Sequence, residues 1–267
     1  MTYGDQHVLI GGVPLGNLSD KRISVHKNKF VLKNLQPADE GTYTCVASNS
    51  EGRVTYDIQL HYSKGAYFDT PLQNITVVEG STLIWPCQAK AVPMNLRYRW
   101  LFQEKELQYG DTTLPFRSNV QGGTLKIFPV LKEDQGWFTC EANNGHDSIA
   151  TSRAFLNVHY SATVLSKTPS IQFIPKSISS FLYCLIDANP PLKFVIWTKD
   201  GQIVNTDTGK RTNVFLSDNG LKLHFRKGTM KDGGIYSCQA YNAIGASNAF
   251  EIHGIVAGMQ ASTEEQK

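Results

Sequence analysis

The chain has 267 residues, enough for two or three domains of ordinary size, and its composition is that of a soluble globular protein. Its net charge of +3 at pH 7 is small for this length and gives no reason to expect nucleic acid or an anionic membrane as a partner. The sequence has no apolar run of the roughly 20 residues that a membrane-spanning helix needs. Its first residues also lack the basic and apolar pattern of a signal peptide.

An internal repeat organises the chain. The pattern D-x-G-x-(aromatic)-x-C occurs three times, in "DEGTYTC", "DQGWFTC" and "DGGIYSC", which end at residues 45, 140 and 238. Spacings of nearly 100 residues correspond to one domain each. The sequence therefore predicts three repeats, at 1–62, 63–160 and 161–256, followed by a polar tail at 257–267.

Each repeat reads as a series of short strands. In chain order, the segments 28–35, 123–128 and 220–225 hold corresponding places, and the last two alternate apolar and polar residues as half-buried antiparallel strands do. The next strands are predicted at 137–144 and 235–242, and a last strand of the second repeat at 150–160. No segment predicts a helix longer than a turn, so the expected class is all-β.

The cysteines indicate which all-β fold this is. Cys87 and Cys140 are 53 residues apart (140 − 87), and Cys184 and Cys238 are 54 apart (238 − 184). A tryptophan lies 13 residues after the first cysteine of each pair, at Trp100 and Trp197. This spacing is typical of the immunoglobulin sandwich, in which a buried indole packs on a disulfide between two sheets. The prediction is a set of tandem immunoglobulin-like β-sandwiches of the intermediate set, with two disulfides.

A tyrosine two residues before the cysteine is also typical of this fold. Tyr43 and Tyr236 are predicted to bond through their hydroxyl groups to the nearby backbone. The second repeat has Phe138 instead and lacks that bond. We expect the neighbouring Trp137 to point to the opposite face and to be covered by an adjoining loop or domain; an exposed contact residue is the alternative.

The first repeat departs from this pattern. The 53-residue spacing would place the partner of Cys45 about eight residues before Met1, and the tryptophan near position 5, where there is none. We therefore expect Cys45 to be unpaired and the opening strands to be missing. The apolar residues around Phe30, Leu32 and Tyr43 would then have no opposite sheet, and residues 1–62 would be poorly stable alone.

Longer stretches resemble one particular family. The segment "DANPPLKFVIWTKDG" at 187–201, with "IYSCQAYNAIG" at 235–245, is similar to the Turtle family of neuronal immunoglobulin-superfamily adhesion proteins. The segments 89–103 and 150–165 resemble the preceding domain of that family and its junction. Family members have five immunoglobulin domains, fibronectin type III repeats, a transmembrane helix and a cytoplasmic tail. The resemblance implies that this chain spans part of the second domain and the third and fourth.

The resemblance also implies a function. It predicts an extracellular or cell-surface module that binds other cell-surface proteins, or a second copy of itself, in axon guidance, dendrite self-avoidance or synapse organisation. Two alternatives remain open. One is a soluble secreted protein that binds or blocks a receptor. The other is an intracellular scaffold of the giant muscle-protein type, which the paired cysteines disfavour because disulfides persist in oxidising compartments.

The remaining candidate sites are few. Asn17 and Asn74 are acceptors of the N-x-[ST] type for glycosylation. The histidines do not form a catalytic motif, so we expect no enzyme, cofactor, metal or small-molecule substrate. His61 and His159 occupy equivalent domain-end positions and predict an interdomain hinge. The junctions carry too few acids for calcium to bind between domains.

Overall fold

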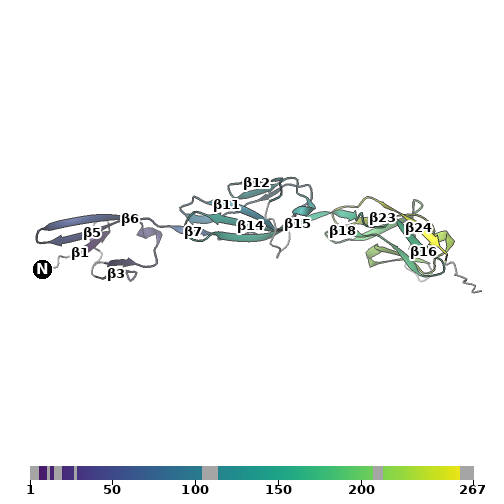
Figure 1. Cartoon of the computed structure of the whole chain (residues 1–267), viewed down its shortest axis with the longest axis horizontal. Coiled ribbons are helices and arrows are strands. Elements are labelled where there is room, and N and C mark those ends of the chain that lie inside the picture. Colours follow the sequence, from purple (N-terminus) through teal and green to yellow (C-terminus); the bar gives the residue numbers. More distant parts are fainter. Residues whose placement is uncertain are drawn as a thin grey trace, which may run out of the picture.

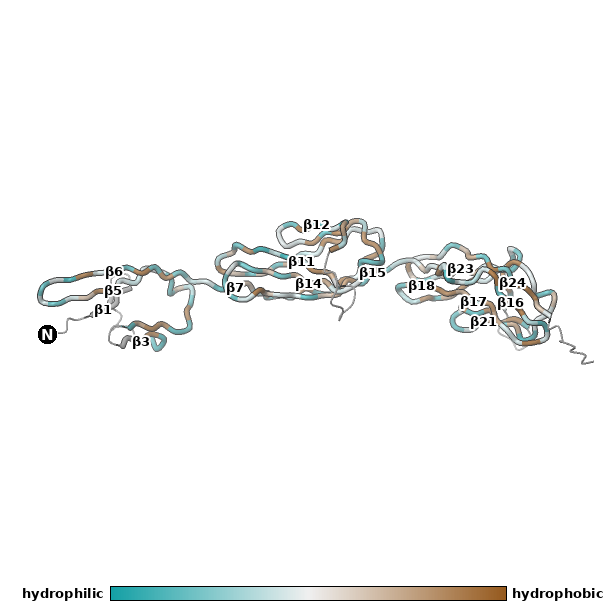
Figure 2. Tube along the Cα trace, in the orientation of Figure 1, coloured by the Kyte–Doolittle hydropathy of each residue, from teal (hydrophilic) through white to brown (hydrophobic). Residues whose placement is uncertain are grey.

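A computed structural model describes residues 6–10, 13–14, 20–26, 29–103, 114–206 and 213–258 of the protein. Strands dominate, and the helical segments among these residues are 3-10 turns of three residues each. The predicted all-β class is confirmed. Three groups of strands follow one another along the long axis of the molecule (Figure 1). Along them, hydrophilic and hydrophobic residues alternate, as two-sheet packing requires (Figure 2).

The second repeat is a complete two-sheet sandwich. Its elements are β7 (Lys64–Tyr67), β8 (Ile75–Val78), β9 (Leu83–Trp85), β10 (Lys90–Val92), β11 (Arg97–Gln103), β12 (Ser118–Gln121), β13 (Thr124–Ile127), η3 (Lys132–Asp134), β14 (Gly136–Asn143) and β15 (Ala150–Val164). One sheet has the order β11-β14-β15, with β8 parallel to β15, and the other has the order β12-β13-β9. β7 pairs with β10 at one end.

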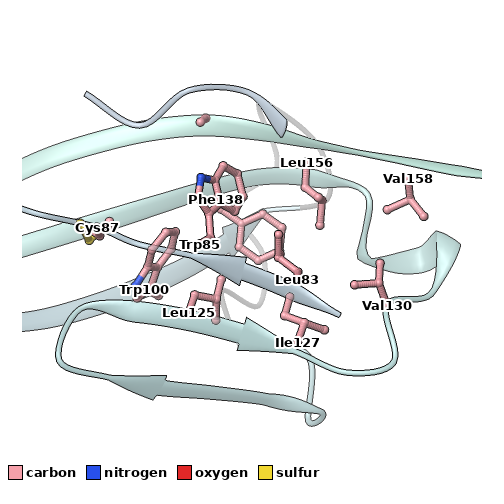
Figure 3. Packing of buried hydrophobic residues seen from close by; sticks show 12 residues of the cluster. Leu83, Trp85, Cys87, Trp100, Leu125, Ile127, Val130, Phe138, Leu156 and Val158 are labelled. Atoms are coloured by element: carbon pink, nitrogen blue, oxygen red, sulfur yellow. A yellow bond between two sulfur atoms is a disulfide. The ribbon is translucent and has the colours of Figure 1, made fainter. Parts of the chain in front are cut away.

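The core of this repeat lies between the two sheets. Trp85 packs against both Trp100 and Phe138, with ring centroids 5.7 Å apart in each pair (Figure 3). Leu83 and Leu125 fill the space beside these rings and are at most 1% exposed. Burial of an apolar side chain of this size contributes about 1.5–3 kcal/mol, so these side chains hold the sheets together.

The third repeat has the same plan. Its elements are β16 (Ile171–Pro175), β17 (Ser180–Tyr183), β18 (Ile186–Asn189), β19 (Phe194–Lys199), β20 (Gln202–Ile203), β21 (Val214–Ser217), η4 (Asp218–Gly220), β22 (Lys222–Phe225), η5 (Met230–Asp232), β23 (Gly234–Tyr241) and β24 (Phe250–Ala257). The sheets have the orders β16-β24-β23-β19-β20 and β17-β22-β21. β18 pairs instead with the end of β15.

The described residues of the first repeat form one sheet and a hairpin. Its elements are β1 (Gln6–Ile10), β2 (Val13–Pro14), β3 (Ile23–His26), β4 (Lys29–Leu32), η2 (Pro37–Asp39), β5 (Gly41–Asn49) and β6 (Gly52–Leu60). They form a sheet of order β2-β1-β5-β6 and a hairpin of β3 and β4. The expectation that Tyr43 has no opposite sheet is wrong, because its ring lies 5.6 Å from that of Phe30 in the hairpin, and Tyr43 is only 6% exposed.

The register of this sheet also shows which residue of the first repeat takes the place of the core tryptophan. β11 and β19 place Trp100 opposite Cys140 and Trp197 opposite Cys238. In the first repeat β1 takes the corresponding place beside β5, and Val8 is the ladder partner of Cys45. The position is therefore residue 8, not residue 5, and it holds a valine.

Candidate recognition surfaces

The repeated aspartate closes the turn before each cysteine-bearing strand. Asp134 Oδ2 accepts a hydrogen bond of 2.8 Å from the backbone N–H of Leu131, and Asp39 and Asp232 accept equivalent bonds of 2.7 Å. The hydroxyls of Tyr43 and Tyr236 donate to the carbonyl oxygens of Asp39 and Asp232, at 2.8 and 2.6 Å. The motif thus fixes the turn and ties it to the strand that follows.

Sequence reasoning missed an arginine that pairs with this aspartate. The Arg117 guanidinium lies 2.8 Å from Asp134 Oδ1, with both side chains largely buried, and Arg22 lies 2.7 Å from Asp39. Hydrogen bonds from Arg22 hold the pKa of Asp39 below its ordinary value. The sequence does carry a sign of this pair, because the arginine lies 17 residues before the aspartate in both repeats. The third repeat has Phe215 at the corresponding position.

Disulfides and tryptophans lie where the spacing predicted. The structure joins Cys87 to Cys140 and Cys184 to Cys238. Cys45 is an exposed free thiol.

Each core indole is held by a turn glycine. Trp100 Nε1 donates to the carbonyl oxygen of Gly123 at 2.9 Å, and Trp197 Nε1 donates to that of Gly220 at 2.7 Å. Gly123 has φ +84° and lies so close to the Cys87 carbonyl that a Cβ atom would be 2.6 Å from it. A glycine is therefore required there.

Two other predicted sites lie at the surface of the second repeat, Asn74 just before β8 and Trp137 in β14. Asn74 is exposed, and its Oδ1 accepts a 2.8 Å hydrogen bond from the backbone N–H of Phe155. Asn17 lies outside the described residues. Trp137 points away from the core and is half-buried on the outward side of β14. Its ring packs edge-on against Phe155 at 5.4 Å, and the Arg153 guanidinium lies 4.5 Å above it.

The junction between the second and third repeats is a continuous strand. β15 pairs with β14 and β8 through residues 150–159, and with β18 through residues 160–164. Because His159 lies inside this strand, the predicted hinge there is wrong. His61 forms a pair of 3.2 Å with Glu40 of its own repeat.

Side chains from both repeats meet along this strand. Asn189 Nδ2 donates to Gln135 Oε1 at 3.0 Å and to Asn157 Oδ1 at 2.8 Å. Asp187 accepts a 2.9 Å bond from the Tyr160 hydroxyl and lies 3.4 Å from Lys132 Nζ. These contacts connect β18 of the third repeat to the end of the second.

The Tyr160 hydroxyl is shielded at this junction. Burial, together with its hydrogen bond to Asp187, raises the pKa of Tyr160 to about 12. The hydroxyl, neutral at physiological pH in any case, therefore keeps its proton and its bond to Asp187 into more alkaline solution.

A second feature that the sequence did not reveal is an asparagine four residues after the cysteine. Asn144 Nδ2 donates to the carbonyl oxygens of Lys64 and Pro93, at 3.0 and 3.2 Å. Asn242 Nδ2 makes the equivalent bonds to the carbonyls of Tyr160 and Pro190. Each asparagine anchors the chain where it enters its repeat.

Two outward sheet faces present side chains suited to protein contacts. On the third repeat, Ile171, Phe173, Ile235 and Ile255 are 54%, 61%, 46% and 43% exposed and surround His253 across β16, β24 and β23. A few anchor side chains carry most of the energy at protein interfaces, and an exposed cluster of apolar side chains offers such anchors.

The outer face of the second repeat is more polar. It carries Trp137 beneath Arg153, and Arg99 lies 3.9 Å from Glu141. Tryptophan and arginine are enriched at interface hot spots. The two faces therefore differ in chemistry: the face of the second repeat combines a tryptophan with charged side chains, and that of the third is mainly apolar.

Comparison with protein families decides the identity of the repeats. An immunoglobulin domain family matches residues 68–144 and 164–242, and an immunoglobulin I-set domain family matches residues 11–61. The chain belongs to the immunoglobulin family. The second and third immunoglobulin repeats carry its disulfide and its buried tryptophan, and the first carries neither.

Relatives confirm the predicted resemblance to the Turtle family. The chain is 32% identical to Protein turtle of Drosophila melanogaster over 82% of its length, and 31% identical to Protein turtle homolog B of Homo sapiens over 91%. It is 30% identical to Protein borderless of Drosophila melanogaster over 84%. It spans 14%, 18% and 31% of the length of these relatives, respectively.

Solved structures support the tandem immunoglobulin fold. An I-band fragment of titin aligns with a TM-score of 0.58 at 23% identity, covering 97% of this chain and 89% of that one. A complex of Dpr2 with DIP-Theta immunoglobulin domains aligns with a TM-score of 0.63 at 18% identity, covering 94% and 89%. At these identities the likeness concerns the fold alone.

Two kinds of feature are absent from the part of the chain that the structure describes. They contain no group of three or more metal-ligating side chains. Among them, no helix has the length and apolar character needed to cross a membrane.

Proposed function

We propose that this chain is an extracellular recognition module that acts by binding cell-surface proteins, a second copy of itself included. The observation that carries the proposal is its similarity of about 30% to turtle and borderless proteins across most of its three repeats. In the Turtle family, such modules take part in axon guidance, dendrite self-avoidance and synapse organisation, and we assign this chain to the same processes.

Several features of the molecule support this role. The repeats are joined by short connections, which suits an elongated module that presents its sheet faces sideways (Figure 1). The exposed apolar side chains of the third repeat and the Trp137–Arg153 pair of the second are suitable anchors.

The proposal includes the domain limits 1–62, 63–160 and 161–256, and glycans on Asn74 and Asn17. The Asn74 side chain is exposed, so a glycan there would project from the edge of the second repeat. It would restrict which faces of that repeat can pair with a partner.

Coated beads test the proposal. Beads carrying the chain should aggregate with one another if binding is homophilic, or bind neuronal cells without aggregating if it is heterophilic. Control beads carry the reduced and alkylated chain, which has lost both disulfides. If coated beads neither aggregate nor bind neuronal cells beyond this control, the proposal is wrong.

A further inference from the structure

The second repeat has an open groove beside its disulfide. The groove has a volume of about 840 Å³ and lies between residues 68–75 and 85–90. The first of these segments joins β7 to β8, and the second runs from β9 to β10 and contains Cys87. Asp69 and Lys90, one from each wall, form an ion pair of 2.5 Å. The groove therefore opens where the ladder of β7 and β10 ends.

The third repeat closes the corresponding gap with hydrogen bonds. Gln172 Nε2 donates to the carbonyl oxygen of Tyr183, and Gln172 Oε1 accepts from the Tyr183 backbone N–H, both at 2.9 Å. The Thr168 hydroxyl accepts a 3.1 Å bond from the backbone N–H of Leu185. Gln172 and Thr168 are only 6% and 3% exposed, so these bonds lie inside the repeat. They hold the start of β16 against the chain around Cys184.

The second repeat cannot make the corresponding pair of bonds. The ladders of β8 with β15 and of β16 with β24 place Ile75 where the third repeat has Gln172. Pro86 stands where the third repeat has Tyr183, in each case directly before the first cysteine. Isoleucine has no polar side-chain group, and proline has no backbone N–H. Among the residues that the structure describes, the backbone N–H and carbonyl of Gln88 have no hydrogen-bond partner, so Gln88 offers both to a ligand in the groove.

The walls of the groove combine apolar and polar side chains. Phe68, Met94 and Tyr98 contribute apolar surface, and Thr70 and Gln73 contribute hydrogen-bonding groups. A sugar ring has the same mixture, with C–H groups on its faces and hydroxyl groups around its rim. Aromatic rings carry partial negative charge on their faces, which favours contact with C–H groups. The lining therefore suits a carbohydrate better than a purely apolar ligand.

The acceptor of a glycan lies in the wall of this groove. Asn74 is exposed, lines the groove, and forms the N-x-[ST] pattern with Ile75 and Thr76. Its Oδ1 accepts the bond from the Phe155 N–H, whereas its Nδ2, the atom that carries a glycan, has no hydrogen-bond partner among the described residues. At the corresponding position the closed third repeat has Ile171, to which no glycan can be attached. The open groove and the glycan acceptor therefore occur together.

We propose that the first sugars of a glycan on Asn74 lie in this groove and are bound by it. This inference deepens the proposed function and rests on it, because the glycan on Asn74 belongs to that function. The amide and hydroxyl groups of these sugars bond to the free backbone groups of Gln88, and their apolar faces pack against Met94 and Tyr98. Because the glycan is attached to the wall of the groove, its effective concentration there is high. The sugars fill the gap that Gln172 closes in the third repeat.

Enzymatic cleavage of the glycan tests this proposal on the full chain. The chain is secreted from cells that attach high-mannose glycans and is then treated, still folded, with an endoglycosidase that cuts between the first two sugars. The enzyme cannot reach sugars that lie in the groove, so cleavage at Asn74 should be slow. Mass spectrometry of glycopeptides measures both the occupancy and the rate of cleavage at each asparagine.

A second sequon in the same molecule provides the matched control. The double substitution Ile171→Asn and Phe173→Thr places a glycan at the corresponding position of the third repeat, where Gln172 closes the gap. The two replaced side chains are 54% and 61% exposed, so the third repeat should still fold. We expect the glycan at position 171 to be cleaved about tenfold faster than that at Asn74, as for a glycan on Asn74 that is bound about 90% of the time.

A further variant closes the groove. Ile75→Gln with Pro86→Tyr introduces the closing pair of the third repeat and keeps the N-x-[ST] pattern at Asn74. If its tryptophan emission matches that of the unmodified chain, cleavage at Asn74 should rise to the rate at position 171. If this variant does not fold, the comparison of positions 74 and 171 still decides.

The outcomes separate this inference from the proposed function. Equal cleavage rates at positions 74 and 171, or no acceleration in the folded variant with the closed groove, would overturn this inference alone and leave the glycan in place. Absence of any glycan from Asn74 would overturn this inference together with the glycan of the proposed function. Recognition of cell-surface proteins is measured by the beads and depends on neither result.

Discussion

At the scale of single residues, the aspartate of the repeated motif is the most informative position. Asp134 combines a backbone bond with a buried pair to Arg117, and their side chains are 4% and 13% exposed. Asp232 makes the backbone bond and a 2.7 Å bond from the Thr229 hydroxyl, and the position that corresponds to Arg117 holds Phe215. The two aspartates therefore contribute differently to the stability of their repeats.

Because of this difference, we expect substitution of the two aspartates to lower the free energy of unfolding by unequal amounts. Asp134→Ala leaves a buried guanidinium unpaired and should lower the free energy of unfolding of the second repeat by about 3–5 kcal/mol. Asp232→Ala should cost the third repeat only about 1–2 kcal/mol. Denaturant unfolding followed by tryptophan fluorescence measures both, since Trp100 and Trp197 report on different repeats. Equal costs would show that the arginine pair does not contribute.

The sequence predicted individual residue positions correctly where the spacing between residues is typical of a single fold. Cys87, Trp100 and Cys140 lie at distances set by the sandwich, and the structure brings them together. The Arg117–Asp134 pair was also in the sequence, but an arginine 17 residues before an aspartate acquires meaning only when two repeats are compared.

At the scale of elements, β15 is the feature that sets the geometry of the junction. It belongs to the sheet of the second repeat and pairs with β18 of the third. Asn189 adds hydrogen bonds across the junction, of 2.8 Å to the Val158 carbonyl and 3.0 Å to Gln135. The sequence predicted a hinge here and did not reveal these contacts, because they join residues more than 30 positions apart.

Removal of that asparagine should loosen the junction. Asn189→Ala deletes the side-chain bonds from β18 to Gln135, Asn157 and Val158 of the second repeat, so small-angle X-ray scattering should give a broader distribution of intramolecular distances. Asn213→Ala is the matched control, because the Asn213 side chain bonds to the backbone of Lys227, within the third repeat and away from the junction. Scattering from the Asn189 variant that matches both the unmodified chain and the control would contradict a role for Asn189 in rigidity.

At the scale of the whole molecule, the three repeats differ in what stabilises them. Two have a disulfide that closes a loop of more than 50 residues, and the first has the free thiol of Cys45 and a partly open face. The sequence indicated this asymmetry, but it did not show that a hairpin covers Tyr43, because that coverage depends on how β3 and β4 fold back.

Reduction should therefore act on the repeats selectively. A reductant should lower the stability of the second and third repeats by about 4 kcal/mol each, from the loop-closure entropy of their disulfides. Exchange in residues 29–60 should not change. Hydrogen exchange with mass spectrometry separates these regions; faster exchange in 29–60 on reduction would contradict this assignment.

Recognition of cell-surface proteins is tested most directly by binding of the fluorescent chain to neuronal cells, measured by flow cytometry before and after the cells are treated with a protease. The account predicts saturable binding that unlabelled chain competes away and that protease treatment abolishes. Binding that does not saturate, or that survives the protease, would contradict recognition of a protein on the cell surface.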